Sequence, residues 1–339
     1  MIKRLDTAAF PRWDNFVQSH PEATFFHLSG WKTVIEKAFR HRCYFLYSER
    51  DGEITGVLPL VHVNSLLFGN NLSSTAFCVY GGIVANDADS YAALDAEACR
   101  LAAELQVDSL EMRNRQRQKP ERPFKDLYVT FRKQLDSDVE KNFLAIPRKQ
   151  RAMVRKGIDA GLTSTIDSGV GRLHQAYSES VRNLGTPVFS KNYFQTLKDV
   201  FKDQCEVLSV EHNGQLIASV MNFYFRDEVL PYYGGGTDLA RELKGNDFMY
   251  WEVMRRAVEK GVKVFDYGRS KIGTGSYSFK KNWGFTPEPL FYEFHLVKAT
   301  AMPDINPLNP KYQLFIVAWK RLPLPISQFI GPFLSKDLG

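Results

Sequence analysis

The chain contains two copies of one series of elements, and this repeat limits the possible folds more than any other feature. The first copy opens with a β-rich hairpin at Cys43–Val61, with Asp51-Gly52 at its turn. The second opens with a similar hairpin at Glu206–Phe225, with Asn213-Gly214 at its turn. Dipeptides of this kind predict type I′ turns, because both central positions need a positive φ.

Each hairpin is followed by the same further elements: a strand ending in Tyr-Gly-Gly, a helix with apolar residues at helical spacing, and a short strand. Corresponding positions lie at nearly constant separations, which indicates a duplicated unit, although such pieces also recur by chance in α/β proteins. The paired segments are Tyr80–Gly82 and Tyr233–Gly235 at the strand ends, 90–105 and 240–260 for the helices, and Ser109–Arg113 and Val262–Asp266 for the last strands.

This order of elements resembles the acetyltransferase-like (GNAT) fold, in which a mixed sheet splays between two central strands and substrates enter the gap. We therefore expect an α/β protein with two tandem GNAT-like (acyl-CoA N-acyltransferase-like) domains with mixed sheets. The expected boundaries are 1–135 for the first domain, 136–298 for a second domain that carries the active site, and 299–339 for a Pro-rich, apolar C-terminal tail.

The composition, 44% hydrophobic and 24% charged, is typical of a soluble globular chain, and the net charge of +6 favours an anionic partner. The four cysteines show no C-x-x-C spacing and the seven histidines no metal-ligand spacing, so we expect neither a disulfide framework nor a metal site. The first residues contain no apolar signal segment. We expect a cytoplasmic protein, with the inner-membrane surface as a possible site of peripheral binding.

The segment Val264–Ser270 is followed by a Gly/Ser loop and then by Tyr277-Ser278-Phe279-Lys280 with further aromatic residues. This arrangement resembles the signature of the Fem-type (FemAB/FemX) aminoacyltransferases, which move an amino acid from aminoacyl-tRNA to an amine of a peptidoglycan precursor. Phe25–Trp31 resembles the opening helix of that family, Ile146–Gly157 its basic helix, and Tyr232–Gly236 its Tyr-Ala-Gly strand end. The resemblance covers about residues 13–298.

Three segments are most similar to the Fem-related proteins associated with exosortase (PEP-CTERM) and exopolysaccharide systems: Leu184–Val188, Phe265–Ser270 and Asn306–Tyr312. The chain departs from the family at Ile35, where Fem enzymes carry a lysine that contacts the phosphates of the acceptor. It also lacks the long helical arm of some members. The resemblance implies an amine acceptor on a cell-envelope or exopolysaccharide precursor rather than the nucleotide-peptide of cell-wall synthesis.

The resemblance also implies catalytic roles. Lys280 would stabilise the tetrahedral oxyanion, and the backbone carbonyl of Phe279 would orient the acceptor amine. Asp266, at a strand end, would act as a base or hold Arg269. The structural alternatives are a solvated helix face for Lys280, a loop-fixing pair with Arg269 for Asp266, and packing for Tyr233 and Tyr277. The predicted substrate-binding residues are Tyr233, Arg269, Tyr277, Arg148, Arg151, Arg155 and Trp31.

Arg148, Arg151 and Arg155 lie three and four residues apart, so a helix places them on one face. Such a face suits the phosphates of tRNA, a nucleotide sugar or a lipid pyrophosphate, although many charged faces are only solvated surface. The segment Arg241–Asp247 is one residue too long for a pyrophosphate loop and lacks its second small residue. We therefore expect aminoacyl-tRNA as donor, acyl-CoA as the alternative, and no cofactor or metal.

The tail at 312–334 is apolar with few charges. It is suited to a membrane interface, with Trp319, Phe329 and Phe333 as anchors, or to packing on the first domain or a partner chain. The chain is predicted to be a transferase, moving an aminoacyl or acyl group to an amine. The alternatives are an acyl-CoA-dependent N-acyltransferase and a non-catalytic binding protein of a polysaccharide export system.

Overall fold

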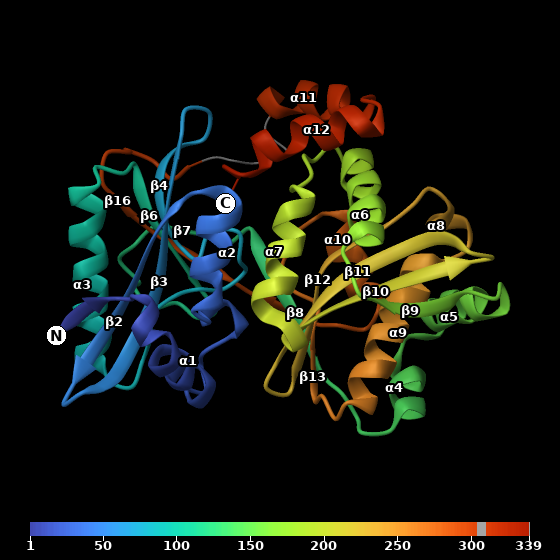
Figure 1. Cartoon of the computed structure of the whole chain (residues 1–339), viewed down its shortest axis with the longest axis horizontal. Helices are drawn as coiled ribbons and strands as arrows, with labels where there is room; N and C mark the ends of the chain where they lie inside the picture. The colour runs from blue at the N-terminus through green and yellow to red at the C-terminus, as the bar shows by residue number, and fades with distance from the viewer. Residues whose placement is uncertain (304–309, 339) are drawn as a thin grey trace. The chain divides into compact units, whose positions relative to one another are not determined.

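The computed structural model describes residues 1–303 and 310–338, and it divides into two compact units (Figure 1). The first unit comprises Met1–Tyr128, Pro289–Ile305 and Lys336–Gly339. The second comprises Val129–Glu288 and Asn306–Ser335. Residues 306–309 of the segment Asn306–Tyr312, which carried part of the resemblance, lie outside the described residues.

The sheet of the first unit has the strand order β1-β2-β3-β4-β6-β16-β7, with β5 paired to β3. Its described pairings are antiparallel except that of β4 with β6, which makes the sheet mixed. Its elements are β1 (Ile2–Arg4), α1 (Phe10–Ser19), α2 (Gly30–Phe39), β2 (Arg42–Arg50), β3 (Glu53–Ser65), β4 (Gly69–Ser74), β5 (Val84–Ala85), α3 (Ala88–Glu104), β6 (Ser109–Asn114), β7 (Phe124–Lys125) and β16 (Phe291–Leu296).

The sheet of the second unit has the order β14-β8-β13-β12-β11-β10-β9, with β15 paired to β8, and β12 runs parallel to β13. Its elements are β8 (Tyr128–Gln134), α4 (Val139–Ala145), α5 (Arg148–Asp159), β9 (Thr163–Asp167), α6 (Gly171–Leu184), α7 (Lys191–Phe201), β10 (Cys205–His212), β11 (Gln215–Phe225), β12 (Glu228–Gly236), α8 (Leu239–Glu242), α9 (Gly245–Glu259), β13 (Val264–Asp266), β14 (Ser270–Lys271), α10 (Gly275–Asn282), β15 (Pro287–Pro289), α11 (Pro310–Lys320) and α12 (Leu324–Ser335).

Both predicted hairpins are present and open the two copies of the repeat. Their turn residues have positive φ, 52° and 84° at Asp51 and Gly52, and 50° and 76° at Asn213 and Gly214. In each unit the hairpin leads to a third antiparallel strand, a helix and a strand parallel to the third. The sequence repeat therefore corresponds to a structural repeat, except that β4 ends at Ser74, so the predicted strand end at Tyr80–Gly82 lies in the loop after that strand.

One strand of each sheet comes from the other side of the repeat boundary. β8 follows the first copy in sequence but pairs with β13 of the second, and β16 follows the second copy but pairs with β6 of the first. The expected boundaries at 135 and 298 therefore differ from the structural division at 128 and 288. Sequence order cannot reveal this exchange, because an antiparallel partner can be supplied by either neighbouring segment.

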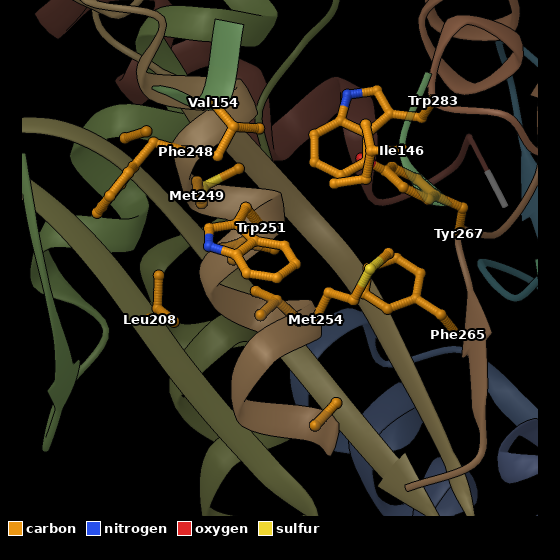
Figure 2. Close-up of a cluster of buried hydrophobic side chains, with 14 of the residues drawn as sticks. Ile146, Val154, Leu208, Phe248, Met249, Trp251, Met254, Phe265, Tyr267 and Trp283 are labelled. Carbon is orange, nitrogen blue, oxygen red and sulfur yellow. The ribbon is translucent and has the colours of Figure 1, made fainter. Parts of the chain in front are cut away.

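The sheet of the second unit is covered on both faces, as neighbouring glycines of β12 show. A Cβ built on Gly234 would lie 3.0 Å from the Tyr250 hydroxyl of α9, whereas one on Gly235 would lie 2.9 Å from the Ala176 carbonyl oxygen of α6. Successive strand residues point to opposite faces, so α9 and α6 cover opposite faces. The core on the α9 side includes Trp251, Phe265 and Trp283 (Figure 2).

The tail forms two helices that pack on α6 of the second unit (Figure 1). Gly185 contacts Ile316 of α11, and Gln328 of α12 donates a 2.7 Å hydrogen bond to Ser178. Helices α11 and α12 therefore belong to the second unit. Across the described ranges, the helices are too short or too polar to cross a bilayer.

Candidate active site

The parallel pair β12–β13 separates within the second sheet. Pairing stops after Val229 with Phe265, yet β12 continues to Gly236, while the chain after β13 turns away to form β14 beside β8. We call this point the β12–β13 fork. Backbone groups along the inner edge of a forked strand lie outside the sheet's regular ladder and need other hydrogen-bond partners.

Lys280 of α10 reaches the end of β13 at this fork. It is 9% exposed, and its Nζ donates hydrogen bonds of 3.0 Å to the carbonyl oxygens of Gly268 and Arg269. The amine also lies 5.6 Å from the ring centroids of Phe131 and Tyr267. The alternative of a solvated Lys280 is thus wrong, whereas the neighbouring Lys281 is exposed.

Burial lowers the pKa of Lys280 to about 7, because the charged amine loses hydration. The carboxylate of Asp266 opposes this shift and the guanidinium of Arg269 adds to it. The structure therefore brings three of the predicted residues within electrostatic range of one another. A lysine with this pKa is present in both protonation states near neutral pH.

Asp266 is almost fully buried and pairs with Arg132 of β8, at 3.0 Å. It also accepts hydrogen bonds from the Thr130 hydroxyl at 3.3 Å and from the Gly268 backbone N–H at 2.8 Å. Arg132 in addition binds Glu228. These contacts fix the turn after β13, and so they fix the carbonyls that hold Lys280.

Phe279 and Tyr277 are half-buried on α10. The ring of Phe279 packs against Tyr250 and Trp283, with centroids 5.8 and 6.2 Å apart, and the ring of Tyr277 packs edge-on to Phe131 at 5.6 Å. Tyr277 therefore holds α10 against β8, and Phe279 holds it against α9. Arg269 is exposed beside them.

Tyr233 lies on the other face of the sheet, in an aromatic cluster with residues of α6 and α7. Its ring centroid is 5.7 Å from that of Tyr177 and 5.3 Å from that of Phe194, and its hydroxyl is 2.7 Å from that of Tyr193. Tyr267, in contrast, packs on the α9 side. The structure therefore gives Tyr233 a packing role and does not bring it together with Lys280.

Trp31 is fully buried in the first unit. Its indole N–H donates a 3.1 Å hydrogen bond to the carbonyl oxygen of Phe25, and its ring packs on Phe25 and Phe26 at 5.8 Å. A substrate could reach it only if this core opened. The predicted binding role of Trp31 therefore does not fit the structure, which makes it a core residue.

The arginines of α5 are divided between packing and solvent. Arg151 donates a 2.6 Å hydrogen bond to the Leu144 carbonyl oxygen, and Arg155 stacks 5.5 Å from the Phe143 ring centroid. Arg148 is exposed. The three do share a helix with Lys149 and Lys156, both exposed, so a positive surface is present as expected.

A buried polar network links α5 to α9 and α10. Asp247, in the first turn of α9, accepts hydrogen bonds from the Gln150 amide and, at 3.1 Å, from the Trp283 indole. Burial raises the pKa of Asp247. The N-terminus of α9 therefore already holds an acidic side chain where a coenzyme A enzyme of this fold would hold a pyrophosphate.

Three polar groups near the fork were missed by the sequence analysis. Both side-chain polar atoms of Asn222, the hydroxyl of Tyr267 and that of Ser270 are buried without hydrogen-bond partners. Asn222 faces Pro231 across β11 and β12, at a register shift between the strands. Its signal in the sequence is an amide inside an otherwise apolar strand. Unpaired buried polar groups are costly, so such groups beside a fork indicate a ligand site.

The corresponding fork in the first unit is closed. After the last β4–β6 pair, Ser73 with Glu111, the buried Arg113 ties the following loop to β6. Its guanidinium donates a 2.7 Å hydrogen bond to the Cys78 carbonyl oxygen, and its own carbonyl accepts one of 3.2 Å from Gly82. The open fork thus belongs to the second unit. Among the residues that the structure describes, no group of three His, Cys, Asp or Glu side chains could hold a metal.

Comparison with known proteins identifies the fold. Residues 148–281 match the family model of the acetyltransferase (GNAT) domain. Among curated proteins, none is significantly similar in sequence. Several solved structures, in contrast, are similar over most of this chain.

The crystal structure of FemX covers 93% of this chain and 100% of its own, at 14% identity and a TM-score of 0.68. The C-terminal domain assigned to a lysylphosphatidylglycerol synthetase from Agrobacterium fabrum covers 85% and 91%, at 14% identity and a TM-score of 0.57. A tandem GNAT protein of the clavulanic acid pathway covers 89% and 99%, at 12% identity and a TM-score of 0.56. The predicted fold class, two tandem GNAT-like domains with mixed sheets, is confirmed.

Proposed function

We propose that this chain transfers an aminoacyl or acyl group to an amine, and that the reaction takes place at the β12–β13 fork of the second unit. The observation that carries the proposal is the position of Lys280. Its amine is buried, is fixed by two carbonyl oxygens and lies 5.6 Å from the ring centroid of Tyr267, whose buried hydroxyl lacks a hydrogen-bond partner. The match of residues 148–281 to an acetyltransferase domain supports the same reaction class.

The amine of Lys280 suits the stabilisation of an oxyanion. A protonated lysine has three N–H donors, and two of them are held by Gly268 and Arg269. The third is free to meet the oxygen of a carbonyl under attack. Because the first two fix its direction, the group is organised before the reaction begins, which is the main source of such stabilisation.

In this reaction each bond that forms is matched by one that breaks, and the protons are accounted for. The acceptor amine forms a bond to the donor's carbonyl carbon, and the carbonyl oxygen takes the negative charge opposite Lys280. When that charge collapses, the bond to the leaving group breaks. The attacking nitrogen loses a proton, and the leaving oxygen or sulfur gains one. Charge on the oxyanion favours protonated Lys280 at a pH where the free amine is half neutral.

Two features support aminoacyl-tRNA over acyl-CoA as donor. The first turn of α9 already holds the buried Asp247, so a pyrophosphate there would meet a like charge if that carboxyl were ionised. The exposed cations of α5 offer a surface for RNA phosphates, and Gln150 and Trp283 connect α5 to α10 through Asp247. Acyl-CoA is the alternative donor.

We propose an amine on a cell-envelope or exopolysaccharide precursor as acceptor. The proposal rests on the resemblance to the exosortase-associated and exopolysaccharide-associated Fem-related proteins. The name of one structural neighbour, a lysylphosphatidylglycerol synthetase, agrees with a lipid as acceptor. The opposing hypothesis is a non-catalytic binding protein of a polysaccharide export system.

The test incubates the purified protein with tRNA charged with labelled amino acids and, separately, with labelled acyl-CoA, each with a fraction of envelope precursors. Lys280→Met removes the proposed donor. Lys281→Met is the matched control, since Lys281 is the adjacent, exposed lysine of the same helix. We expect Lys280→Met to lower kcat about 10²–10³-fold and Lys281→Met to leave it nearly unchanged.

Transfer from tRNA alone would support the proposal as stated, and transfer from acyl-CoA alone would keep the site but replace the donor. Equal rates for Lys280→Met and the wild type would remove Lys280 from the chemistry. Absence of transfer from both donors, with a complete set of precursors and folded protein, would favour the binding protein.

A further inference from the structure

Helix α12 is packed with its small residues inward and its large apolar residues outward. Ser327, Gly331 and Ser335, spaced four residues apart, are its buried positions. Phe329 is 73% exposed and Phe333 63% exposed, and Ile326 and Ile330 are exposed beside them. The usual helix of a folded domain has the opposite polarity.

The inner contacts fix this orientation. A Cβ built on Gly331 would lie 2.9 Å from both the nitrogen and the oxygen of Val188, and the Ser335 hydroxyl donates a 3.0 Å hydrogen bond to the same oxygen. Gln328 donates to Ser178 of α6 at 2.7 Å. Turning the helix to bury its phenylalanines would break these contacts. The outward apolar face is therefore a built feature of the second unit.

Helix α11 also exposes large apolar residues. Leu314, Phe315 and Val317 are exposed, whereas Trp319 is buried against the fold. Of the 16 large hydrophobic residues exposed in the described chain, seven lie between 314 and 333. We call these seven residues of α11 and α12 the tail face. Its members are Leu314, Phe315, Val317, Ile326, Phe329, Ile330 and Phe333.

The charged residues within the tail segment are all cations. The sequence contains no Asp or Glu between Asp304 and Asp337, whereas Lys320, Arg321 and Lys336 are exposed at the helix ends. An apolar helical face bordered by cations is the pattern of a segment that lies in the interface of an anionic bilayer. A symmetric contact with a second copy would instead bring these like charges together.

We propose that the tail face is a peripheral membrane anchor, which inserts its phenylalanines between the lipids of an anionic membrane and holds the second unit at that surface. The proposal rests on α11 and α12 alone and stands apart from the proposed acyl transfer. Each phenylalanine that enters the bilayer interface adds apolar burial, and each nearby Lys or Arg adds attraction to anionic headgroups.

The test is co-sedimentation of the full chain with vesicles of phosphatidylglycerol and phosphatidylethanolamine, and with vesicles of phosphatidylcholine alone. The variant Phe329→Ser/Phe333→Ser removes the two most exposed phenylalanines of the tail. Leu66→Ser/Leu67→Ser is the matched control, since these residues are 106% and 72% exposed in the first unit. Thermal unfolding of every variant checks the fold, and light scattering after gel filtration gives the oligomeric state.

We expect the wild type and the leucine variant to bind anionic vesicles, and the phenylalanine variant to bind about 10-fold more weakly or less. Binding to phosphatidylcholine should be weaker for all of them. Absence of wild-type binding, or equal binding of all variants, would overturn the proposal. A wild-type dimer that the phenylalanine substitutions dissociate, without vesicle binding, would assign the tail face to a second copy instead.

Discussion

Lys280 shows how burial changes what a side chain can do. Its amine has two carbonyl oxygens and two aromatic rings around it and little water, so its pKa lies at about 7. The neighbouring Lys281 has the same side chain but is exposed to solvent, so it has no such environment. The pKa of Lys280 therefore leads to several measurable predictions about the site.

If Lys280 acts as a cation, activity should fall as the pH rises through about 7, because the amine then loses its proton. The measurement is the pH profile of kcat/KM for the wild type and for Lys280→Met, which should lack this limb. A rise of wild-type activity over the same range would contradict the oxyanion role and favour Lys280 as a general base.

The same pKa predicts a pH-dependent stability. The pKa of Lys280 is lowered on folding from 10.5 to about 7, so between these values the unfolded chain binds more protons than the folded one. The wild type should therefore gain free energy of unfolding as the pH rises from 7 toward 10.5, by up to a few kcal/mol relative to Lys280→Met. Urea unfolding of both proteins at two pH values measures the difference, and parallel changes would contradict the assignment.

Asp266→Asn should move the activity limb to lower pH, because the carboxylate of Asp266 raises the pKa of Lys280. The amide keeps an oxygen for Thr130 and for the Gly268 N–H. Glu228→Gln is the control, since it removes the other carboxylate bound to Arg132. An unshifted limb in Asp266→Asn would show that the field of Asp266 does not reach the reacting amine.

Among the secondary-structure elements, strand β12 and helix α6 are joined through close backbone contact. Gly235 of β12 leaves no space for a side chain, because α6 crosses directly over it. The three successive glycines at the end of β12 thus have a packing reason, because a Cβ on each would meet atoms of α6, α8 or α9 within 3.0 Å.

Gly235→Ala should destabilise the second unit by about 1–3 kcal/mol, because its Cβ would lie 2.8 Å from the Ser180 Cβ and 2.9 Å from the backbone of α6. Gly169→Ala is the control, since a Cβ there meets no atom within 4 Å. Thermal and urea unfolding compare the two. A similar stability for both variants would show that α6 moves away at little cost.

In the molecule as a whole, each sheet depends on a strand from the other side of the sequence boundary. β16 belongs to the first sheet although the entire second repeat separates it from β6. Because of this exchange, neither repeat, taken as a continuous segment, contains all the strands of one sheet.

Residues 1–128 alone should therefore fail to fold, since β6 and β7 would lose β16 between them. The same residues joined by a short Gly/Ser linker to 289–305 should fold, because the Leu290 N–H already donates a 3.0 Å hydrogen bond to the Tyr128 carbonyl oxygen. Circular dichroism and cooperative unfolding distinguish the two chains. A stably folded 1–128 fragment would contradict the dependence on β16.

Local chemistry in the sequence determined the elements of the repeat. Asp51-Gly52 and Asn213-Gly214 specify their turns through backbone sterics, which act over two residues and need no tertiary context. The same holds for the helical face of α5 and for the position of Lys280 one turn into a helix capped by Thr274. The fold class and the lysine at the centre of the candidate site could be predicted for this reason.

Tertiary structure alone decided which residues and strands contact one another. Asp266 pairs with Arg132, which is distant in sequence. Tyr233 of β12 and Tyr267, directly after β13, lie on opposite faces of one sheet although these two strands are neighbours. The sequence pattern also does not determine three other features of the fold. These are the exchange of β8 and β16, the burial of Trp31 and the outward orientation of the phenylalanines of α12. The physical reason is that strand pairing, burial and pKa depend on atoms brought together by the whole chain, whereas turns and helix faces depend on near neighbours.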